Sequence, residues 1–119
     1  MSVVDQPVRA LPVGPVALAR LFRVLGDETR VRILERLADG PATVAALVTA
    51  LGMPPRSRVS NHLACLAHCG FVTRRRAGKH VVYSLAEVDV TRLLALARGV
   101  AEPHVELLST CSRIGPDWA

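Results

Sequence analysis

The sequence predicts a mainly α-helical domain that carries one small β-hairpin. Apolar residues recur at the three- and four-residue spacing of amphipathic helices from residue 16 to residue 70, and again from residue 89 to residue 108. Between residues 71 and 85 this spacing gives way to β-rich runs. Half of the residues are hydrophobic but only 3% are aromatic, which predicts a core of Leu, Val and Ala that favours helices over a sheet. The length of 119 residues corresponds to one domain.

The chain is predicted to begin with a flexible arm, residues 1–15, because three prolines interrupt any helix there. The folded domain spans residues 16–108, and residues 109–119 form a C-terminal tail that carries Cys111. The first helix has apolar residues at i, i+3, i+4 and i+7, namely Leu18, Leu21, Phe22 and Leu25. Gly26 is predicted to end it.

The second helix is capped by Asp27 and ends before the turn formed by residues 39–41. Its buried face is predicted to consist of Val31, Leu34 and Leu37, with Ile33 beside them.

Residues 43–70 predict a helix-turn-helix. Thr43 caps a short helix that Gly52 closes, and the connection from residue 53 to residue 56 contains two prolines. Ser57 is predicted to cap the next helix, and Gly70 to stop it. Two helices of about nine and thirteen residues joined by a tight link match this motif.

Residues 71–76 and 80–85 flank Ala77-Gly78-Lys79 and predict a β-hairpin. Its tip holds the densest positive charge in the chain, consisting of Arg74, Arg75, Arg76, Lys79 and His80. Such a cluster can be a solvated strand edge, but directly after a helix-turn-helix it favours a DNA-binding wing. The arginines and Lys79 would hold the DNA backbone or the minor groove. The net charge of +5 also favours a polyanionic partner. The predicted fold is therefore a winged helix-turn-helix of the order helix, helix, helix, helix, strand, strand, helix.

Asp89 opens the last helix, which Pro103 kinks or restarts, and residues 112–119 are predicted to be frayed. The first and last helices carry more apolar surface than a helix-turn-helix with a wing can cover. Because a symmetric helical interface would bury this surface, we expect a homodimer formed through these two helices.

The helix from residue 57 to residue 69 has two different faces. Val59, Leu63 and Leu66 fall on one apolar side, and a neighbouring stripe about 100° wide holds Arg58, Asn61, His62, Cys65 and Cys69. In a recognition helix the N-terminal turns enter the major groove. Ser57 and Ser60 would then contact phosphates or bases, and Arg58 a guanine edge or a phosphate. Asn61 and His62 would read bases. The alternative is that these are only capping and solvated polar groups.

Cys65 and Cys69 stand four residues apart, so their Cβ atoms lie about 6 Å apart on a helix. A disulfide requires about 3.8 Å, whereas a metal ion can span the longer distance. A third thiolate from Cys111 would complete a three-sulfur site suited to Cd(II), Pb(II) or trivalent arsenic, but not to hard cations. His104 or Glu102 could add a fourth ligand or a hydrogen bond to a ligand. The alternative is that the cysteines are small buried apolar residues.

Other classes of protein are disfavoured. No apolar run approaches the roughly 18 residues of a membrane span, and residues 1–15 lack a secretory signal, so a cytoplasmic location is expected. Three cysteines, an odd number, do not predict a disulfide framework. His68 and Cys69 point about 100° apart on a helix and cannot act as a base and its nucleophile. No glycine-rich phosphate loop is present, so an enzyme is not expected.

The element order resembles that of the ArsR/SmtB family of metal-sensing repressors across residues 16–108. The resemblance is carried by the motif Leu25-Gly26-Asp27-Glu28-Thr29-Arg30-Val31-Arg32-Ile33-Leu34, by Ser57-Arg58-Val59-Ser60-Asn61-His62-Leu63 and by Val82-Tyr83-Ser84-Leu85. It implies a homodimeric winged-helix repressor that releases operator DNA when it binds a metal or metalloid.

Two metal sites known in that family lack their residues here. The Asp-x-His pair of the last helix is matched by Asp89-Val90-Thr91, without the histidine, and the later partner positions hold Glu102 and Val105. The Cys-x-Val-Cys pair of an earlier helix falls in the region of Ala45, Ala46 and Leu47.

The cysteines resemble those of the cadmium- and lead-sensing CmtR-type branch, which places two on the recognition helix and a third in the C-terminal segment. The resemblance implies Cys65, Cys69 and Cys111 as ligands, and Cd(II) or Pb(II) as the signal. Arsenite or Zn(II), a redox-sensing regulator and a ligand-independent regulator remain open alternatives, as does whether Cys111 binds within one chain or across the dimer.

Overall fold

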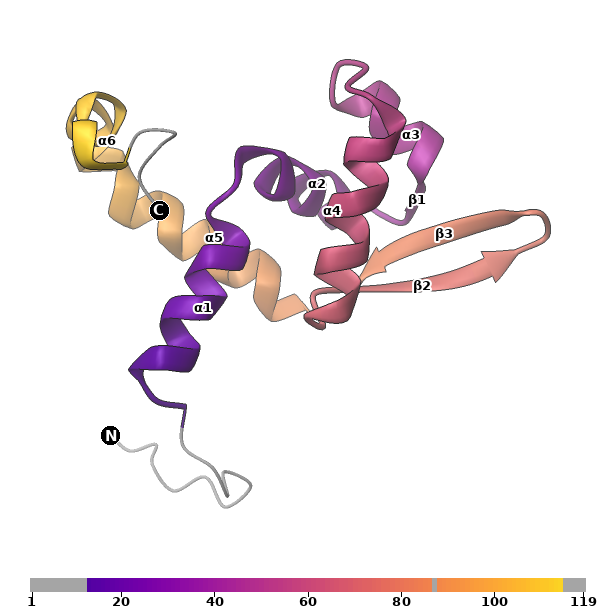
Figure 1. Ribbon diagram of the computed structural model, residues 1–119, viewed down its shortest axis with the longest axis horizontal. Helices are drawn as coiled ribbons and strands as arrows, with labels where there is room; N and C mark the ends of the chain where they lie inside the picture. Colours follow the sequence, from indigo (N-terminus) through magenta and orange to yellow (C-terminus); the bar gives the residue numbers. More distant parts are fainter. Residues whose placement is uncertain (1–12, 87, 115–119) are drawn as a thin grey trace.

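Five helices of seven or more residues and a small sheet make up most of the chain in the computed structural model, which describes residues 13–86 and 88–114 (Figure 1). The elements in order are α1 (Pro15–Leu25), α2 (Glu28–Ala38), β1 (Ala42–Thr43), α3 (Val44–Ala50), α4 (Arg56–His68), β2 (Val72–Ala77), β3 (His80–Leu85), α5 (Val88–Ala101), the 3-10 turn η2 (Glu102–His104), α6 (Val105–Thr110) and the 3-10 turn η3 (Ser112–Ile114). The predicted helix-turn-helix is α3 and α4, and the predicted wing is β2 and β3.

The core lies where α2, α3 and α4 pack together. Its fully buried large side chains are Ile33, Leu34, Leu47, Val59, Leu63 and Leu66. The apolar side of α4 is therefore buried as predicted. On α2 the predicted face is slightly rotated, because Ile33 is fully buried whereas Val31 is only half-buried. Among residues 13–86 and 88–114, none of the fully buried side chains is aromatic, in agreement with the composition.

Two of the predicted helix caps are present, and a third prediction was wrong. Asp27 Oδ2 accepts a hydrogen bond from the Arg30 backbone N–H at 3.1 Å, and Thr43 Oγ1 accepts one from the Ala46 N–H at 3.1 Å. Ser57, however, does not cap α4, because this helix already begins at Arg56 after Pro55. Pro55, which the sequence places inside the connection, has a φ of −56° and leads directly into the helix as its N-cap.

The wing has the predicted register, with Ala77 opposite His80 across a turn in which Gly78 has a φ of 66°. A third strand, β1, was not predicted because two residues are too few to show an alternating pattern. It pairs with β3 through Ala42 opposite Tyr83 and gives the strand order β1-β3-β2. This pairing ties the middle of β3 to the start of α3.

The two ends of the domain differ in detail from the sequence prediction. α1 begins at Pro15, one residue before the predicted start, and residues 1–12 of the predicted arm lie outside the described residues. Pro103 lies in η2, where α5 gives way to α6, as predicted. Residues 112–114 were expected to be frayed but form the 3-10 turn η3, whereas residues 115–119 lie outside the described residues.

Helices α1 and α5 lie on the side of the core away from the wing, where residues of both line one cavity, and α6 follows at the far end of α5 (Figure 1). These helices expose large apolar side chains, which include Val16, Leu18, Phe22, Leu96, Val100, Val105, Leu107 and Leu108. An ion pair between Arg98 and Glu35 joins α5 to α2. None of the helices in the described residues is long and apolar enough to cross a lipid bilayer.

Replacing the fully buried Leu63 by Ala should lower the free energy of unfolding by about 2–5 kcal/mol, because the loss of its side chain leaves a cavity between the core helices. Urea unfolding followed by circular dichroism measures this change. Thr49→Ala, at an exposed position of α3, should change the free energy by no more than about 0.5 kcal/mol. Equal effects of the two substitutions would contradict the assigned core.

Candidate nucleic-acid interface and thiol site

The connection between α3 and α4 is a tight reversal fixed by hydrogen bonds. Gly52 and Met53 both have positive φ values, 85° and 66°. The Met53 N–H donates to the Val48 carbonyl at 2.8 Å, and Arg32 Nη2 of α2 donates to the Leu51 carbonyl at 3.0 Å. These bonds hold the start of α4 at a fixed position relative to α3 and α2.

The first turns of α4 present the predicted reading residues to solvent. Ser57, Arg58 and Asn61 are exposed, whereas Ser60 is half-buried. The helix has neither a side-chain cap nor an acidic residue in its first turn, so its first backbone N–H groups remain available to an anion. Arg56 is also exposed in this turn. It was not predicted as a DNA-facing residue, because the sequence places it in the connection between the two helices.

The basic wing residues are exposed but do not all share one face of the hairpin. Arg74, Arg75, Arg76 and Lys79 are each exposed. Because neighbouring side chains of a strand point to opposite faces, Arg75 lies on the face opposite to that of Arg74 and Arg76. The hairpin therefore has positive charge on both faces.

A cavity of about 630 Å³ joins the wing to the helix-turn-helix. Arg56 of α4 lines it together with Lys79 and His80 of the wing, and Thr43 lies at the start of α3 on the same cavity wall. The start of the recognition helix and the tip of the wing thus face one basic groove, in which the charges of two elements act together.

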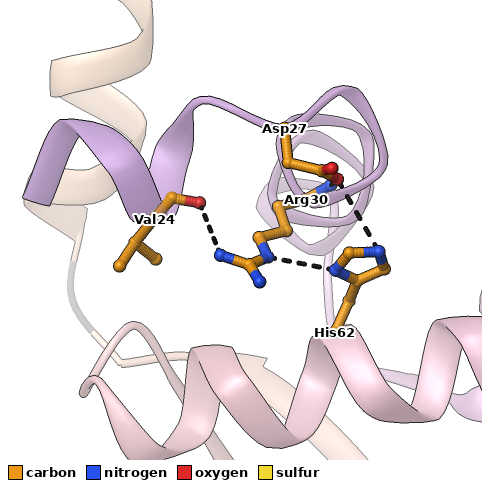
Figure 2. Close-up of polar contacts among 4 residues, drawn as sticks. All are labelled: Val24, Asp27, Arg30 and His62. Atoms are coloured by element: carbon orange, nitrogen blue, oxygen red, sulfur yellow. Dashed lines mark hydrogen bonds and ion pairs between the residues drawn. The ribbon is translucent and has the colours of Figure 1, made fainter. Parts of the chain in front are cut away.

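His62 has contacts that differ from its predicted role as a base reader (Figure 2). Its Nδ1 accepts a hydrogen bond from Arg30 Nε at 3.0 Å, and its Nε2 lies 3.7 Å from Asp27 Oδ2. Both ring nitrogens are therefore directed to α2. His62 is half-buried and joins α4 to the start of α2 instead of pointing with Arg58 and Asn61 to solvent.

The thiols of Cys65 and Cys69 lie together at the C-terminal end of α4. Both are free, with Cys65 half-buried and Cys69 exposed at the C-cap position that follows His68, the last residue of α4. Desolvation raises the pKa of the Cys69 thiol, and the neighbouring Cys65 raises it further through its charge and a hydrogen bond. The positive charges of Arg30 and Arg20 act in the opposite direction and lower this pKa. Gly70, with a φ of 88°, then ends the helix and leads into β2.

Cys111 lies far from this pair within one chain. It follows α6, at the opposite side of the molecule from the C-terminal end of α4 (Figure 1). In residues 13–86 and 88–114, no three His, Cys, Asp or Glu side chains come close enough to hold a metal ion. Glu102 and His104 are exposed in η2, also beyond α5. One chain thus brings together two of the three predicted ligands.

An unpredicted feature is a cavity of about 400 Å³ beside Cys69. Arg20 and Arg23 of α1 line it with Arg30 of α2 and with Phe71. Spacing on α1 alone could have shown that Arg20 and Arg23 share a helix face, but their position beside Cys69 depends on how α1 packs against the rest of the chain.

Replacing Cys65 by Ala should lower the pKa of Cys69, because the charge and the hydrogen bond that disfavour its thiolate are removed. The rate at which a maleimide alkylates Cys69, measured by peptide mass spectrometry at several pH values, should then rise at a lower pH than in the unsubstituted chain. Cys111→Ala is the matched control, because Cys111 is distant, and it should leave this pH profile unchanged. An unchanged profile in Cys65→Ala would show that the two thiols do not interact.

Comparison with known proteins agrees with this geometry. Residues 27–74 match the family model of the bacterial regulatory proteins of the arsR family. A probable mercury resistance operon repressor of Streptomyces lividans is 41% identical over 100 residues, which cover 84% of this chain and 79% of that protein. The transcriptional regulator CmtR of Mycobacterium tuberculosis is 49% identical over 78 residues, which cover 66% of this chain and 65% of that protein.

Solved structures also match. The homodimeric winged helix-turn-helix DNA-binding domain of Mb0332 from Mycobacterium bovis superposes with a TM-score of 0.65 at 39% identity, over 75% of this chain and 82% of that chain. The cadmium metal-sensor CmtR of M. tuberculosis gives a TM-score of 0.55 at 47% identity, over 65% and 79% of the two chains. These relatives are regulators, which confirms the prediction that the chain is not an enzyme. With its helix-turn-helix, its basic wing and these relatives, the chain belongs to the ArsR family of bacterial transcriptional regulators.

Proposed function

We propose that this chain is a metal-responsive transcriptional repressor, which binds operator DNA as a homodimer and is released by a soft, thiophilic metal ion. The observation that carries the proposal is the position of Cys65 and Cys69 on α4, the helix whose first turns expose Ser57, Arg58 and Asn61. A ligand bound by the two thiols acts on the element that would read DNA.

The groove between α4 and the wing supports DNA binding. Phosphates of one strand can approach the uncapped start of α4, where Arg56 and Arg58 add positive charge, while Lys79 reaches the same groove from the wing. Asn61, one turn further along α4, is exposed for base contacts. Because the wing carries arginines on both faces, Arg75 and the pair Arg74 and Arg76 would contact different parts of the duplex.

The exposed apolar residues of α1, α5 and α6 support a dimer formed by the first and last helices. A monomer would leave side chains such as Phe22, Leu96 and Val100 in water, whereas an isologous interface would bury them. The homodimeric state of the Mb0332 domain, which has the same fold, agrees with this arrangement.

The third thiolate is proposed to come from the partner subunit. Cys111 is exposed at the end of α6 and distant from the thiols of its own α4, so it is free to meet those of a second copy. Three thiolates suit Cd(II), Pb(II) or trivalent arsenic, and the cadmium-sensing relative favours Cd(II) among these. Metal binding displaces protons from the thiols, so metal affinity should rise with pH. Because the pKa of Cys69 is raised, this rise should continue to a higher pH than for an ordinary thiol.

A second candidate signal is Hg(II). The relative that covers 84% of this chain is a probable mercury resistance operon repressor, and Hg(II) is soft enough to be held by two thiolates. Cys65 and Cys69 alone would then suffice. The role of Cys111 therefore separates the two candidates.

Cys65→Ser and Cys69→Ser should each abolish release of operator DNA by Cd(II), because both thiolates are needed to hold the ion on α4. Fluorescence anisotropy of labelled DNA measures release, and thiolate-to-metal absorption measures binding in the same titration. Cys111→Ser should also prevent release by Cd(II) but leave release by Hg(II) intact. If the Cys65→Ser dimer released operator DNA at the Cd(II) concentration that releases it from the wild type, the proposed site would be wrong.

Two further tests separate the alternatives. A mixed dimer of one Cys65→Ser, Cys69→Ser chain and one Cys111→Ser chain keeps one complete site only if Cys111 acts across the dimer. Release by hydrogen peroxide without any metal would indicate a redox sensor instead.

Arg56→Ala and Arg75→Ala should each reduce the slope of log affinity against log salt by about 0.9, the value for one lost phosphate contact. DNA titrations between 50 and 300 mM salt, about the range in which such contacts are screened, measure the slope. Arg92→Ala removes the same charge from an exposed position of α5 and should leave the slope unchanged. If all three variants changed the slope equally, only net charge would matter and the proposed interface would be wrong.

A further inference from the structure

Arg30 of α2 connects the end of α1 to the middle of α4 (Figure 2). Its Nη1 donates to the Val24 carbonyl at 3.2 Å, and its Nε donates to His62 Nδ1 at 3.0 Å. The same guanidinium lines the cavity that contains Cys69.

The hydrogen bond from Arg30 determines which nitrogen of the His62 ring carries the proton. A guanidinium only donates, so His62 Nδ1 must accept and carries no proton. In the neutral ring the proton is then on Nε2, which faces Asp27 Oδ2 at 3.7 Å. Asp27 also caps α2 through the Arg30 backbone N–H. The hydrogen bond at Nδ1 thus holds His62, and with it the middle of α4, against α2, while Nε2 is directed to Asp27.

The proposed site of three thiols changes charge when it binds a soft ion. Three neutral thiols and one divalent cation give a complex of net charge −1 and three protons released to solvent. Arg30 and Arg20 line the cavity that contains Cys69, so two positive charges lie beside the thiol pair. A guanidinium placed beside the complex therefore stabilises the metal-loaded state more than the metal-free state.

We propose that Arg30 is the positioning residue that couples the thiol pair to the DNA-reading half of α4. In the metal-free chain it holds His62 and keeps α4 in its DNA-binding position. In the metal-loaded chain its guanidinium turns to the thiolates and gives up the bond to His62, so α4 is no longer held. This inference rests on the proposed function, because it assigns the coupling between the metal site and the DNA site of the same helix.

The two uses of the guanidinium compete, and this gives opposite signs for two substitutions. Arg30→Met removes both interactions, so it should weaken metal-free DNA binding and Cd(II) binding alike. His62→Ala removes only the competing partner, so it should weaken metal-free DNA binding but strengthen Cd(II) binding. A histidine that only reads a base would change DNA affinity and leave Cd(II) affinity unaltered.

The experiment measures Cd(II) affinity by competition with a chelator, and DNA affinity with and without Cd(II), in the full-length chain. His62→Ala should raise Cd(II) affinity about fivefold, the lower end of typical couplings between sites, and Arg30→Met should lower it by a similar factor. His62→Gln keeps an acceptor for Arg30 Nε and should stay near the wild type. Arg36→Met is the matched control, because Arg36 of the same helix donates to the Gly40 carbonyl, away from the thiols.

The DNA affinity of the metal-free dimer is an independent test of the contact between Arg30 and His62. Arg30→Met and His62→Ala should each lower it, and the double variant should lose no more than the larger single loss, because both substitutions break one bond. Additive losses, or an unchanged Cd(II) affinity in His62→Ala, would overturn the coupling role. If Cd(II) does not release DNA from the wild type, the proposed function fails instead, and the metal-free cycle still decides whether Arg30 and His62 position α4 jointly.

Discussion

Burial of one side of α4 against α2 and α3 is the constraint on which the rest of the structure depends. Val59, Leu63 and Leu66 are fully buried, so the rotation of this helix about its own axis is fixed. Helical spacing then decides where every other side chain of α4 points. The exposed first turns and the thiol pair at the end follow from that single packing choice, and a change that tilts the helix moves both.

Much of this arrangement follows from sequence periodicity. The buried faces, the caps at Asp27 and Thr43 and the wing register depend on interactions between residues close in the chain, which a single sequence shows. The proximity of Cys65 and Cys69 belongs to the same class, because helical geometry alone brings them together. The start of α4 was misplaced, since Pro55 can precede a helix as readily as it can interrupt one.

The features that sequence reasoning missed are those created by tertiary packing. Nothing in the spacing of residue 30 and residue 62 indicates that their side chains meet, because the contact depends on how α2 crosses α4. For that reason His62 was assigned to base reading together with its neighbours on the helix. The distance of Cys111 from the thiol pair has the same origin, since it is set by the length of α5 and by the turn at Pro103.

Thr43 serves at once as the last residue of β1 and as the cap of α3, with no loop between them. Its strand pairs with β3 opposite Val82, so the wing and the helix-turn-helix share a rigid joint. A wing attached by a flexible hinge would lose much conformational freedom on settling into a groove. Here most of that entropy is already lost on folding, so the two elements can approach a duplex as one preformed clamp.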